Sequence, residues 1–112
     1  MRNITNHKID KLNECLVVRA LDDPGSGNPP FSYEIHADES KVTLPEGVTV
    51  TTHIQFHIGP FLENSVPNGI STESLLAVVI DRLEHSQKSR ESREALAKLR
   101  EAMIWLRHRV TS

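Results

Sequence analysis

The sequence predicts an α+β fold in which a small antiparallel β-sheet is followed by a C-terminal antiparallel hairpin of two helices. Three observations support this expectation. Alternating apolar and polar stretches, separated by glycine- and proline-rich turns, fill the part of the chain before Gly69. After Gly69 the apolar spacing becomes helical, and a short polar break divides the helical part in two. We therefore expect one domain over residues 1–112, with the sheet in residues 14–60 and the helical hairpin in residues 71–110.

Three strands are expected in the first part of the chain. Residues 14–21 are rich in aliphatic and β-branched side chains and stop at Asp22-Asp23-Pro24-Gly25, which is typical turn chemistry. Residues 31–36 alternate apolar and polar side chains and form the second strand. The third covers residues 48–56 and places four apolar side chains on one face, namely Val48, Val50, Ile54 and Phe56. Residues 38–47, between the second and third strands, are expected to form an exposed hairpin loop.

The first expected helix begins where a hydroxyl side chain can cap it. Ser71 or Thr72 serves as the N-cap, and Glu73 places a negative charge in the first turn, where it suits the helix dipole. Apolar residues recur at helical spacing as far as about Ser86. A second helix is expected over residues 89–108. Its packed seam consists of residues three or four apart, namely Leu96, Leu99, Met103, Leu106 and Val110.

Two further side chains are assigned to the interior by their place in these patterns. Trp105 lies between two seam residues and is expected in the core or at an interface. Cys15 lies in the apolar run of the first strand and is expected to be a small buried hydrophobe. As the only cysteine, it also excludes an intrachain disulfide and a cysteine-based zinc site.

Composition and charge exclude several classes of function. The formal net charge of -2 argues against a nucleic-acid coat, so no nucleic-acid polymer is expected as a partner. No apolar run approaches the length of a membrane-spanning helix, and residues 1–11 lack the apolar core of a signal peptide. We therefore expect no membrane association and a cytoplasmic location. A chain with so small a core often gains stability by oligomerisation, which makes a homo-oligomer the expected state.

No catalytic constellation is recognised, and the chain is not expected to be an enzyme. The sequence contains no nucleophile motif of the GxSxG type and no dinucleotide-binding glycine fingerprint. His53 and His57 would lie about 13 Å apart on a strand, too far to share a metal ion. We therefore expect no catalytic residue, no metal and no cofactor.

The arginines of the C-terminal part point most directly to a ligand. Residues 71–112 contain eight Lys/Arg and six Asp/Glu, and six of these cations are arginines. Arg93, Arg100 and Arg107 are spaced seven residues apart and so share one helix face, where they can hold phosphates. The alternative is a solvated helix face held by ion pairs to nearby glutamates, and the residues by themselves favour this alternative.

Several motifs in combination resemble one known family. They are Phe56-His57-Ile58-Gly59-Pro60, Asn68-Gly69-Ile70, Ile80-Asp81-Arg82-Leu83, Ser89-Arg90-Glu91 and Trp105-Leu106, closing on Arg109. Together they are similar to the phage helical-hairpin family of Thoeris anti-defence and anti-CBASS proteins, and the resemblance covers residues 15–110. No single motif among them is specific, whereas the combination is.

The resemblance implies a non-enzymatic sponge that acts in the cytoplasm of the host cell. Members of that family bind cyclic ADP-ribose isomers, and some bind cyclic oligonucleotides, so that the intact signal never reaches its effector. They assemble as dimers that build into hexamers, with ligands held between protomers. Carried over to this chain, the binding residues are Gly59, Pro60, Phe61, Arg90, Glu91, Ser92, Arg93 and Arg109. Phe61 and Arg109 are expected to stack on a base, and Arg90 and Arg93 to meet phosphates.

The chain departs from the family pattern where polar ligand contacts are expected. His57-Ile58 replaces the usual Gln-Asn before Gly-Pro, and Leu62 replaces a lysine. Ser92 stands where an asparagine usually follows Arg-Glu, and Arg100 stands in place of a glutamate. These departures leave the identity of the ligand open.

Two other functions are weighed against the sponge. The first is an accessory protein that binds a protein partner through the helical hairpin and has no small-molecule pocket. The second is a DNA-binding regulator, which the mild acidity and the lack of a recognition-helix motif make the weakest of the three.

Overall fold

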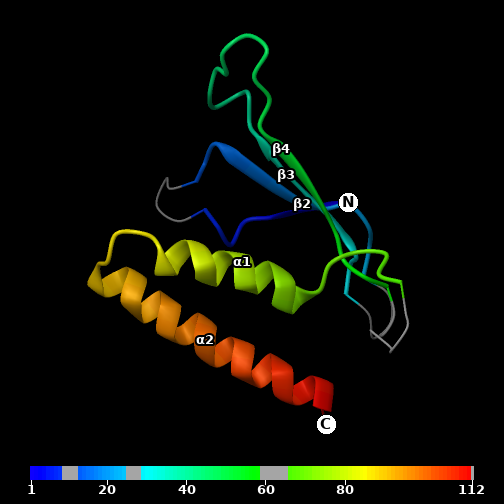
Figure 1. Ribbon diagram of the computed structural model, residues 1–112. Helices are drawn as coiled ribbons and strands as arrows, with labels where there is room; N and C mark the ends of the chain where they lie inside the picture. The colour runs from blue at the N-terminus through cyan, green and yellow to red at the C-terminus, as the bar shows by residue number, and fades with distance from the viewer. Residues whose placement is uncertain (9–12, 25–28, 59–65, 112) are drawn as a thin grey trace. The chain divides into compact units, whose positions relative to one another are not determined.

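A computed structural model describes residues 1–8, 13–24, 29–58 and 66–111. Residues 109–111 are described by their backbone alone. The chain forms two compact units, Met1–Gly69 and Ile70–Ser112. The first contains a four-stranded antiparallel sheet and the second contains two helices (Figure 1). The α+β class and the order of its parts are therefore as the sequence predicts. The single-domain boundary over residues 1–112 stays a prediction.

The sheet has the strand order β1-β2-β3-β4, and every neighbouring pair is antiparallel. Its strands are β1 (Arg2–Ile4), β2 (Leu16–Ala20), β3 (Ser32–Ala37) and β4 (Thr51–Gln55). Sequence analysis did not identify β1, because three residues are too few to show a period. The remaining strands agree with the expected positions to within three residues at each end.

The register divides the sheet into a polar and an apolar face. Arg19 pairs with Glu34, and Glu34 pairs with His53, so these three side chains lie in one row across three strands. On the opposite face, Tyr33 meets Phe56 edge-on with ring centroids 5.6 Å apart, and Ala20 is fully buried. The core of this unit therefore lies against the second face.

Asp22 closes the connection between β2 and β3, as its turn sequence predicts. Its carboxylate accepts the backbone N–H of Phe31 at 2.9 Å and that of Ser32 at 2.9 Å. The hydrogen bond from Phe31, followed by that from Ser32, lowers the pKa of the Asp22 carboxyl below 3.8. Cys15 precedes β2 and is only half-buried, so its assignment to the interior was wrong.

The expected third strand is wrong in including Val48 and Val50. Each is 45% exposed, and β4 begins only at Thr51. The backbone N–H of Ala37 still binds the carbonyl of Val50 at 2.9 Å, but β3 ends there. Both valines therefore precede the strand and lie at the surface.

Both helices begin with reciprocal serine caps. In α1 (Thr72–Glu84) the N-cap is Ser71, which confirms one of the two expected caps, and Ser71 and Ser74 each accept the other's backbone N–H at 3.0 Å. Glu73 lies in the first turn, as predicted. The second helix, α2 (Arg90–Thr111), extends three residues past the expected end.

The seam of α2 is buried mainly at two positions. Leu96 is 6% exposed and Met103 is 9% exposed, whereas Leu99 and Leu106 are half-buried. The side chain of Val110 lies outside the described part. Trp105 is 67% exposed, which overturns its place in the core, because it lies about 100° around the helix from Leu106. Among the residues that the structure describes, neither helix has the length and apolar content needed to cross a membrane.

Candidate functional site

The structure describes five of the eight binding residues expected from the sequence, and all five belong to α2. Gly59, Pro60 and Phe61 lie outside the described residues. Four others, Arg90, Glu91, Ser92 and Arg93, occupy the first two turns of α2. Arg109 belongs to the last turns of the same helix, and its side chain lies outside the described part. Arg109 lies nineteen positions after Arg90 in the helix, which is roughly 28 Å along the axis.

The first turn of α2 is built on a second serine capping box. Ser89 Oγ accepts the backbone N–H of Ser92 at 3.0 Å, and Ser92 Oγ accepts that of Ser89 at 2.9 Å. The Ser92 hydroxyl also lies 3.1 Å from the Ser89 carbonyl oxygen, to which it donates. In this chain, therefore, Ser92 is first of all a helix-capping residue.

Arg93 folds back over this capped turn. Both its backbone N–H and its Nε donate to the carbonyl oxygen of Ser89, at 3.0 and 3.3 Å. Arg90 is exposed at the first helical position, and Glu91 is the acidic residue of the first turn. The arrangement places two guanidinium groups at a helix N-terminus, where the helix dipole is itself positive and disfavours cations. An anion bound at this end would relieve that repulsion.

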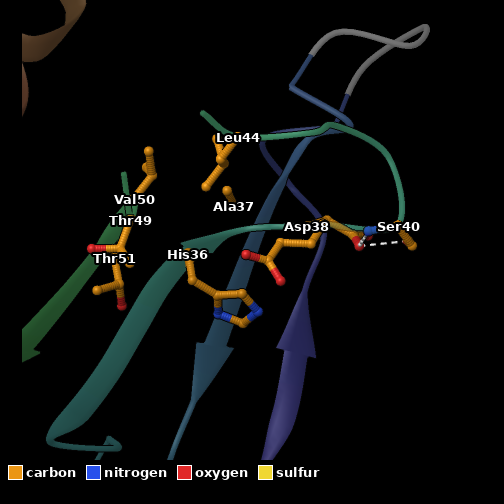
Figure 2. A pocket seen from close by; sticks show the side chains of 9 residues that line it. His36, Ala37, Asp38, Ser40, Leu44, Thr49, Val50 and Thr51 are labelled. Atoms are coloured by element: carbon orange, nitrogen blue, oxygen red, sulfur yellow. Dashed lines mark hydrogen bonds between the residues drawn. The ribbon is translucent and has the colours of Figure 1, made fainter. Parts of the chain in front are cut away.

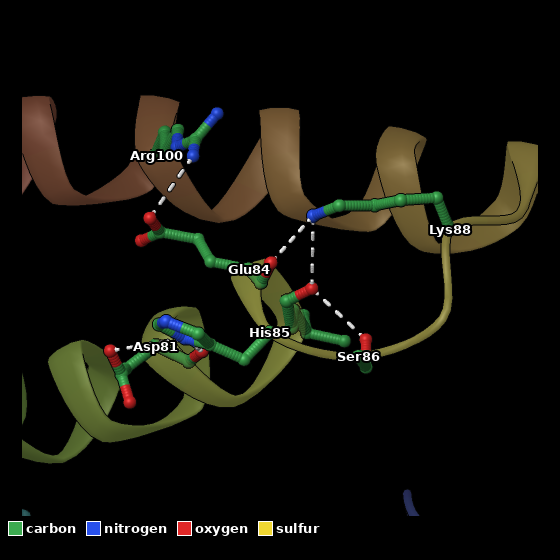
Figure 3. Close-up of polar contacts among 7 residues, drawn as sticks. Asp81, Glu84, His85, Ser86, Lys88 and Arg100 are labelled. Carbon is green, nitrogen blue, oxygen red and sulfur yellow. Dashed lines mark hydrogen bonds and ion pairs between the residues drawn. The ribbon is translucent and has the colours of Figure 1, made fainter.

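The turn between the helices closes α1 with polar contacts (Figure 3). Lys88 Nζ lies 2.8 Å from the carbonyl oxygen of Glu84, and Ser86 Oγ donates to the Leu83 carbonyl at 2.9 Å. His85 Nδ1 lies 2.9 Å from the carbonyl oxygen of Asp81 and 3.5 Å from its carboxylate. That hydrogen bond first, and then the Asp81 charge, raises the pKa of His85 above 6.5.

Two arginines of the line on α2 have contacts within the chain that can be described, namely Arg93 and Arg100. Arg100 Nη2 lies 3.6 Å from Glu84 Oε2 on the neighbouring helix (Figure 3), and Arg93 is bound to Ser89 as described above. Arg107 is exposed on the same helix. The ion pair of Arg100 agrees with the alternative interpretation, in which these arginines form a solvated, ion-paired helix face. Its partner, Glu84, belongs to α1 and not to α2.

A cavity that sequence analysis did not anticipate lies at the ends of β3 and β4 (Figure 2). It has a volume of about 450 Å³ and is lined by His36, Ala37, Asp38, Glu39, Ser40, Leu44, Thr49, Val50 and Thr51. The hydrogen bonds from Ser40 lower the pKa of the Asp38 carboxyl, the one from its hydroxyl more than the one from its N–H. The acidic and hydroxyl groups that line the cavity suit hydroxyl-bearing or cationic ligands better than phosphates. In the sequence, the cavity could have been indicated only by Asp38-Glu39-Ser40, and these residues are equally typical of an exposed loop.

The residues that flank segment 59–67 hold one another by polar contacts. The backbone N–H of Asn68 donates to His57 Nδ1 at 3.1 Å, and that of Ile58 donates to Asn68 Oδ1 at 2.8 Å. His57 and Ile58, two of the departures from the family pattern, thus participate in local structure here. No three or more His, Cys, Asp and Glu side chains within the described ranges are grouped so that they could hold a metal ion.

Comparison with known proteins gives one informative similarity. No family model matches the chain. The chain is 35% identical over 92 residues to the protein "Thoeris anti-defense 1" of Bacillus phage SBSphiJ7. The matched part is 75% of this chain and 64% of that relative, so the chain spans less than two thirds of the relative's length.

Proposed function

Since the chain belongs to the phage Thoeris anti-defence family, we propose that it is a non-enzymatic sponge, which binds an intact cyclic nucleotide immune signal and withholds it from the effector. Its ligands are cyclic ADP-ribose isomers, cyclic oligonucleotides or both. It acts in the cytoplasm of the host cell and needs no metal or cofactor. The name of the relative supports the anti-defence role, and the residues of α2 support the anionic ligand.

The observation that carries the proposal is the pair of arginines at the capped start of α2. Arg90 is exposed, and the Arg93 guanidinium lies over the first turn through its bond to Ser89. Guanidinium groups bind phosphate oxygens in a planar, bidentate manner. Placed at a helix N-terminus, they add to the attraction that free backbone N–H groups exert on an anion. A cyclic nucleotide with a phosphate or pyrophosphate fits this chemistry.

The length of α2 favours a ligand shared between chains. Arg90 and Arg109 of one chain are separated by roughly 28 Å along the helix, farther than one small nucleotide can bridge. If both bind the same molecule, they come from different protomers. The proposed sponge is therefore a homo-oligomer, with dimers assembling into a hexamer. Burial between two chains also removes more of the ligand's surface from water.

The second candidate function is binding of a protein partner through the helical hairpin. Four large apolar side chains of that unit are at least 40% exposed, and they are Val78, Val79, Ile104 and Trp105. Exposed apolar surface of this kind marks protein–protein contact. Self-assembly into the proposed oligomer is the other use of the same side chains, and the ligand experiment below separates the two functions.

The test is capture and release of an intact nucleotide. The purified protein is incubated with cyclic ADP-ribose isomers and cyclic oligonucleotides, washed by filtration and denatured by heat, and the released molecules are identified by mass spectrometry. We expect stoichiometric recovery of an unaltered cyclic nucleotide. An empty protein, or one that releases a cleaved product, would refute the sponge.

A double variant tests the residues. Arg90→Ala combined with Arg109→Ala is expected to abolish capture while the oligomer measured by light scattering stays intact. Arg82→Ala, which removes an exposed arginine from the last turn of α1, is the matched control and keeps wild-type capture. Wild-type capture by the double variant would show that the site lies elsewhere.

A further inference from the structure

The sheet has an unpaired outer edge along β4, the last strand in the order β1-β2-β3-β4. Within the described residues, Thr49, Thr51 and His53 have no hydrogen-bond partner for the backbone groups that point away from β3. We infer that this outer edge pairs with the same edge of a second copy of the chain, as two antiparallel strands related by a two-fold axis at Thr51.

The ladder to β3 determines which backbone groups point outward. The carbonyl of Val50 accepts the N–H of Ala37, the last residue of β3, so the backbone groups of Val50 face β3. In an antiparallel ladder the N–H and C=O of one residue point to the same side, and the side alternates from residue to residue. Thr49, Thr51 and His53 therefore present their backbone groups to the outer edge.

The two edges of the sheet differ in how far they are protected from another chain. β1 is three residues long and contains Arg2, and both short length and charge discourage pairing. On the β4 side, residues 48–58 contain no Asp, Glu, Lys, Arg or Pro. Residues 48–52 are all β-branched, and the first three residues of β4 are exposed. The outer edge of β4 thus lacks the usual devices that prevent strand addition.

Self-complementarity identifies a second copy as the partner. With the two-fold axis at Thr51, the two Thr51 residues face each other and Thr49 of each copy faces His53 of the other. All the outward backbone groups then meet outward groups. On the apolar face of the sheet, Val48, which is 45% exposed within one chain, comes opposite Ile54 of the other copy.

The two ends of the outer edge select this register. A Cβ atom added at Gly69 would lie 2.5 Å from the carbonyl oxygen of Gln55, so the chain already runs against that carbonyl. Moving the axis one residue toward the C-terminus would require Gln55 to pair. Moving it one residue toward the N-terminus would require Gly47, whose φ of 81° lies outside the range of a strand. The axis at Thr51 needs neither residue.

This contact deepens the proposed function, because it rests on the homo-oligomer that the sponge forms. A hexamer built from dimers needs at least two kinds of contact, since one two-fold contact closes on itself as a dimer. The outer edge of β4 is one of them, and it is separate from the exposed apolar side chains of the helical unit. Its tests contain no nucleotide, so their outcome does not depend on ligand binding.

Disulfide trapping tests the pairing and its register. In a Cys15→Ser background, Thr51→Cys places the thiols of two copies in one hydrogen-bonded pair with Cα atoms about 5.5 Å apart, which a disulfide can span. We expect a linked dimer on non-reducing gels after oxidation with diamide. Thr49→Cys is the matched control, because its two copies lie about 14 Å apart and should stay unlinked. No link through Thr51→Cys, or equal linking through Thr49→Cys, overturns the inference.

A proline at the axis tests the contribution of the outward N–H. Thr51→Pro removes that N–H, and edge strands tolerate proline where the N–H faces solvent, so the ladder to β3 remains. We expect the mass measured by light scattering to fall to half the wild-type value or less, with unchanged circular dichroism. Thr51→Val keeps the N–H and the β-branched shape and should assemble as wild type does. A folded Thr51→Pro variant with wild-type mass overturns the inference, and the disulfide test decides if that variant does not fold.

The remaining outcomes separate this inference from the sponge itself. A protein that links through Thr51→Cys but captures no nucleotide refutes the sponge alone. If the purified chain is a single 12.6 kDa species, the outer edge serves a strand of a different protein, and pairing between copies is overturned. Capture of a nucleotide by that single species would leave the sponge standing without the β4 contact.

Discussion

Ser89 and Ser92 each accept the other's backbone N–H, at 3.0 and 2.9 Å respectively, and together they start the helix that carries the proposed ligand arginines. Ser71 and Ser74 do the same for α1. Each pair encloses a glutamate at its third position, so that Glu73 and Glu91 both lie in a first turn. The repeated Ser-X-Glu-Ser pattern thus defines both helix starts in this unit.

Removal of the α2 cap should destabilise the helical unit without altering an arginine. We expect Ser89→Ala to lower the free energy of unfolding by about 0.5–2 kcal/mol, because the N–H of Ser92 loses its acceptor. Ser89→Asp retains a capping oxygen and should remain close to wild type. Urea denaturation followed by circular dichroism measures both. Equal destabilisation by the two variants would contradict a capping role.

Gly69 should tolerate no side chain. Because the added Cβ would lie within 2.6 Å of two backbone oxygens, Gly69→Ala is expected to cost about 1–3 kcal/mol of stability. Gly47 is a suitable comparison, since it has a φ of 81° but nothing within 4 Å of its added Cβ. Asparagine tolerates that left-handed conformation, so Gly47→Asn should change stability little. Thermal melts measure the stability of both variants. If Gly69→Ala were as stable as wild type, the backbone would be able to move apart at this position.

His85 should make the helical unit more stable at mildly acidic pH. Its pKa is raised in the folded state, first by the hydrogen bond to the Asp81 carbonyl and then by the Asp81 charge. The proton is therefore bound more tightly after folding, so this stabilisation is fully present below about pH 6.5 and is lost as pH rises through the higher folded pKa. His85 is exposed, so added salt should weaken the effect.

The measurement for His85 is the difference in melting temperature between wild type and His85→Gln at about pH 6 and about pH 8. We expect wild type to exceed the variant at the lower pH and the difference to shrink at the higher one. Because the other five histidines are shared by both proteins, their titration cancels in this comparison. A difference that grows with pH would contradict the assignment.

Local chemistry made the helix starts and the β2–β3 turn predictable from sequence. A serine before an apolar helical pattern satisfies N–H groups within its own turn, and Asp22 binds two N–H groups only nine and ten residues away. Such interactions depend on neighbours in the chain, which the sequence displays. The α1 cap and the turn were therefore identified without knowledge of the tertiary fold, whereas the role of Ser89 as the cap of α2 was not predicted.

Features that depend on distant partners were missed or misassigned. The alternation over residues 48–56 placed Val48 and Val50 in one strand with Ile54 and Phe56, but β4 begins only at Thr51 and both valines are exposed. The cavity beside His36 depends on how a loop returns to the sheet, which no spacing reveals. Of the candidate site, the sequence placed Arg90 and Arg93 together on one helix, whereas the bond from Arg93 Nε to the Ser89 carbonyl could not be foreseen from the spacing.

Of the two places predicted for Trp105, its 67% exposure rules out the core, and the interface of the proposed oligomer stays a prediction. We expect Trp105→Lys to reduce the mass measured by light scattering toward the 12.6 kDa of one chain, because an ammonium group cannot be buried against an apolar surface without a partner. The helical content should remain unchanged, since the side chain is exposed within the chain. Gln87→Lys adds the same charge in the exposed turn between the helices and should leave the oligomer intact. If Trp105→Lys assembles as wild type does, this face of α2 takes no part in the oligomer, and a protein partner becomes the better explanation for its exposed side chains.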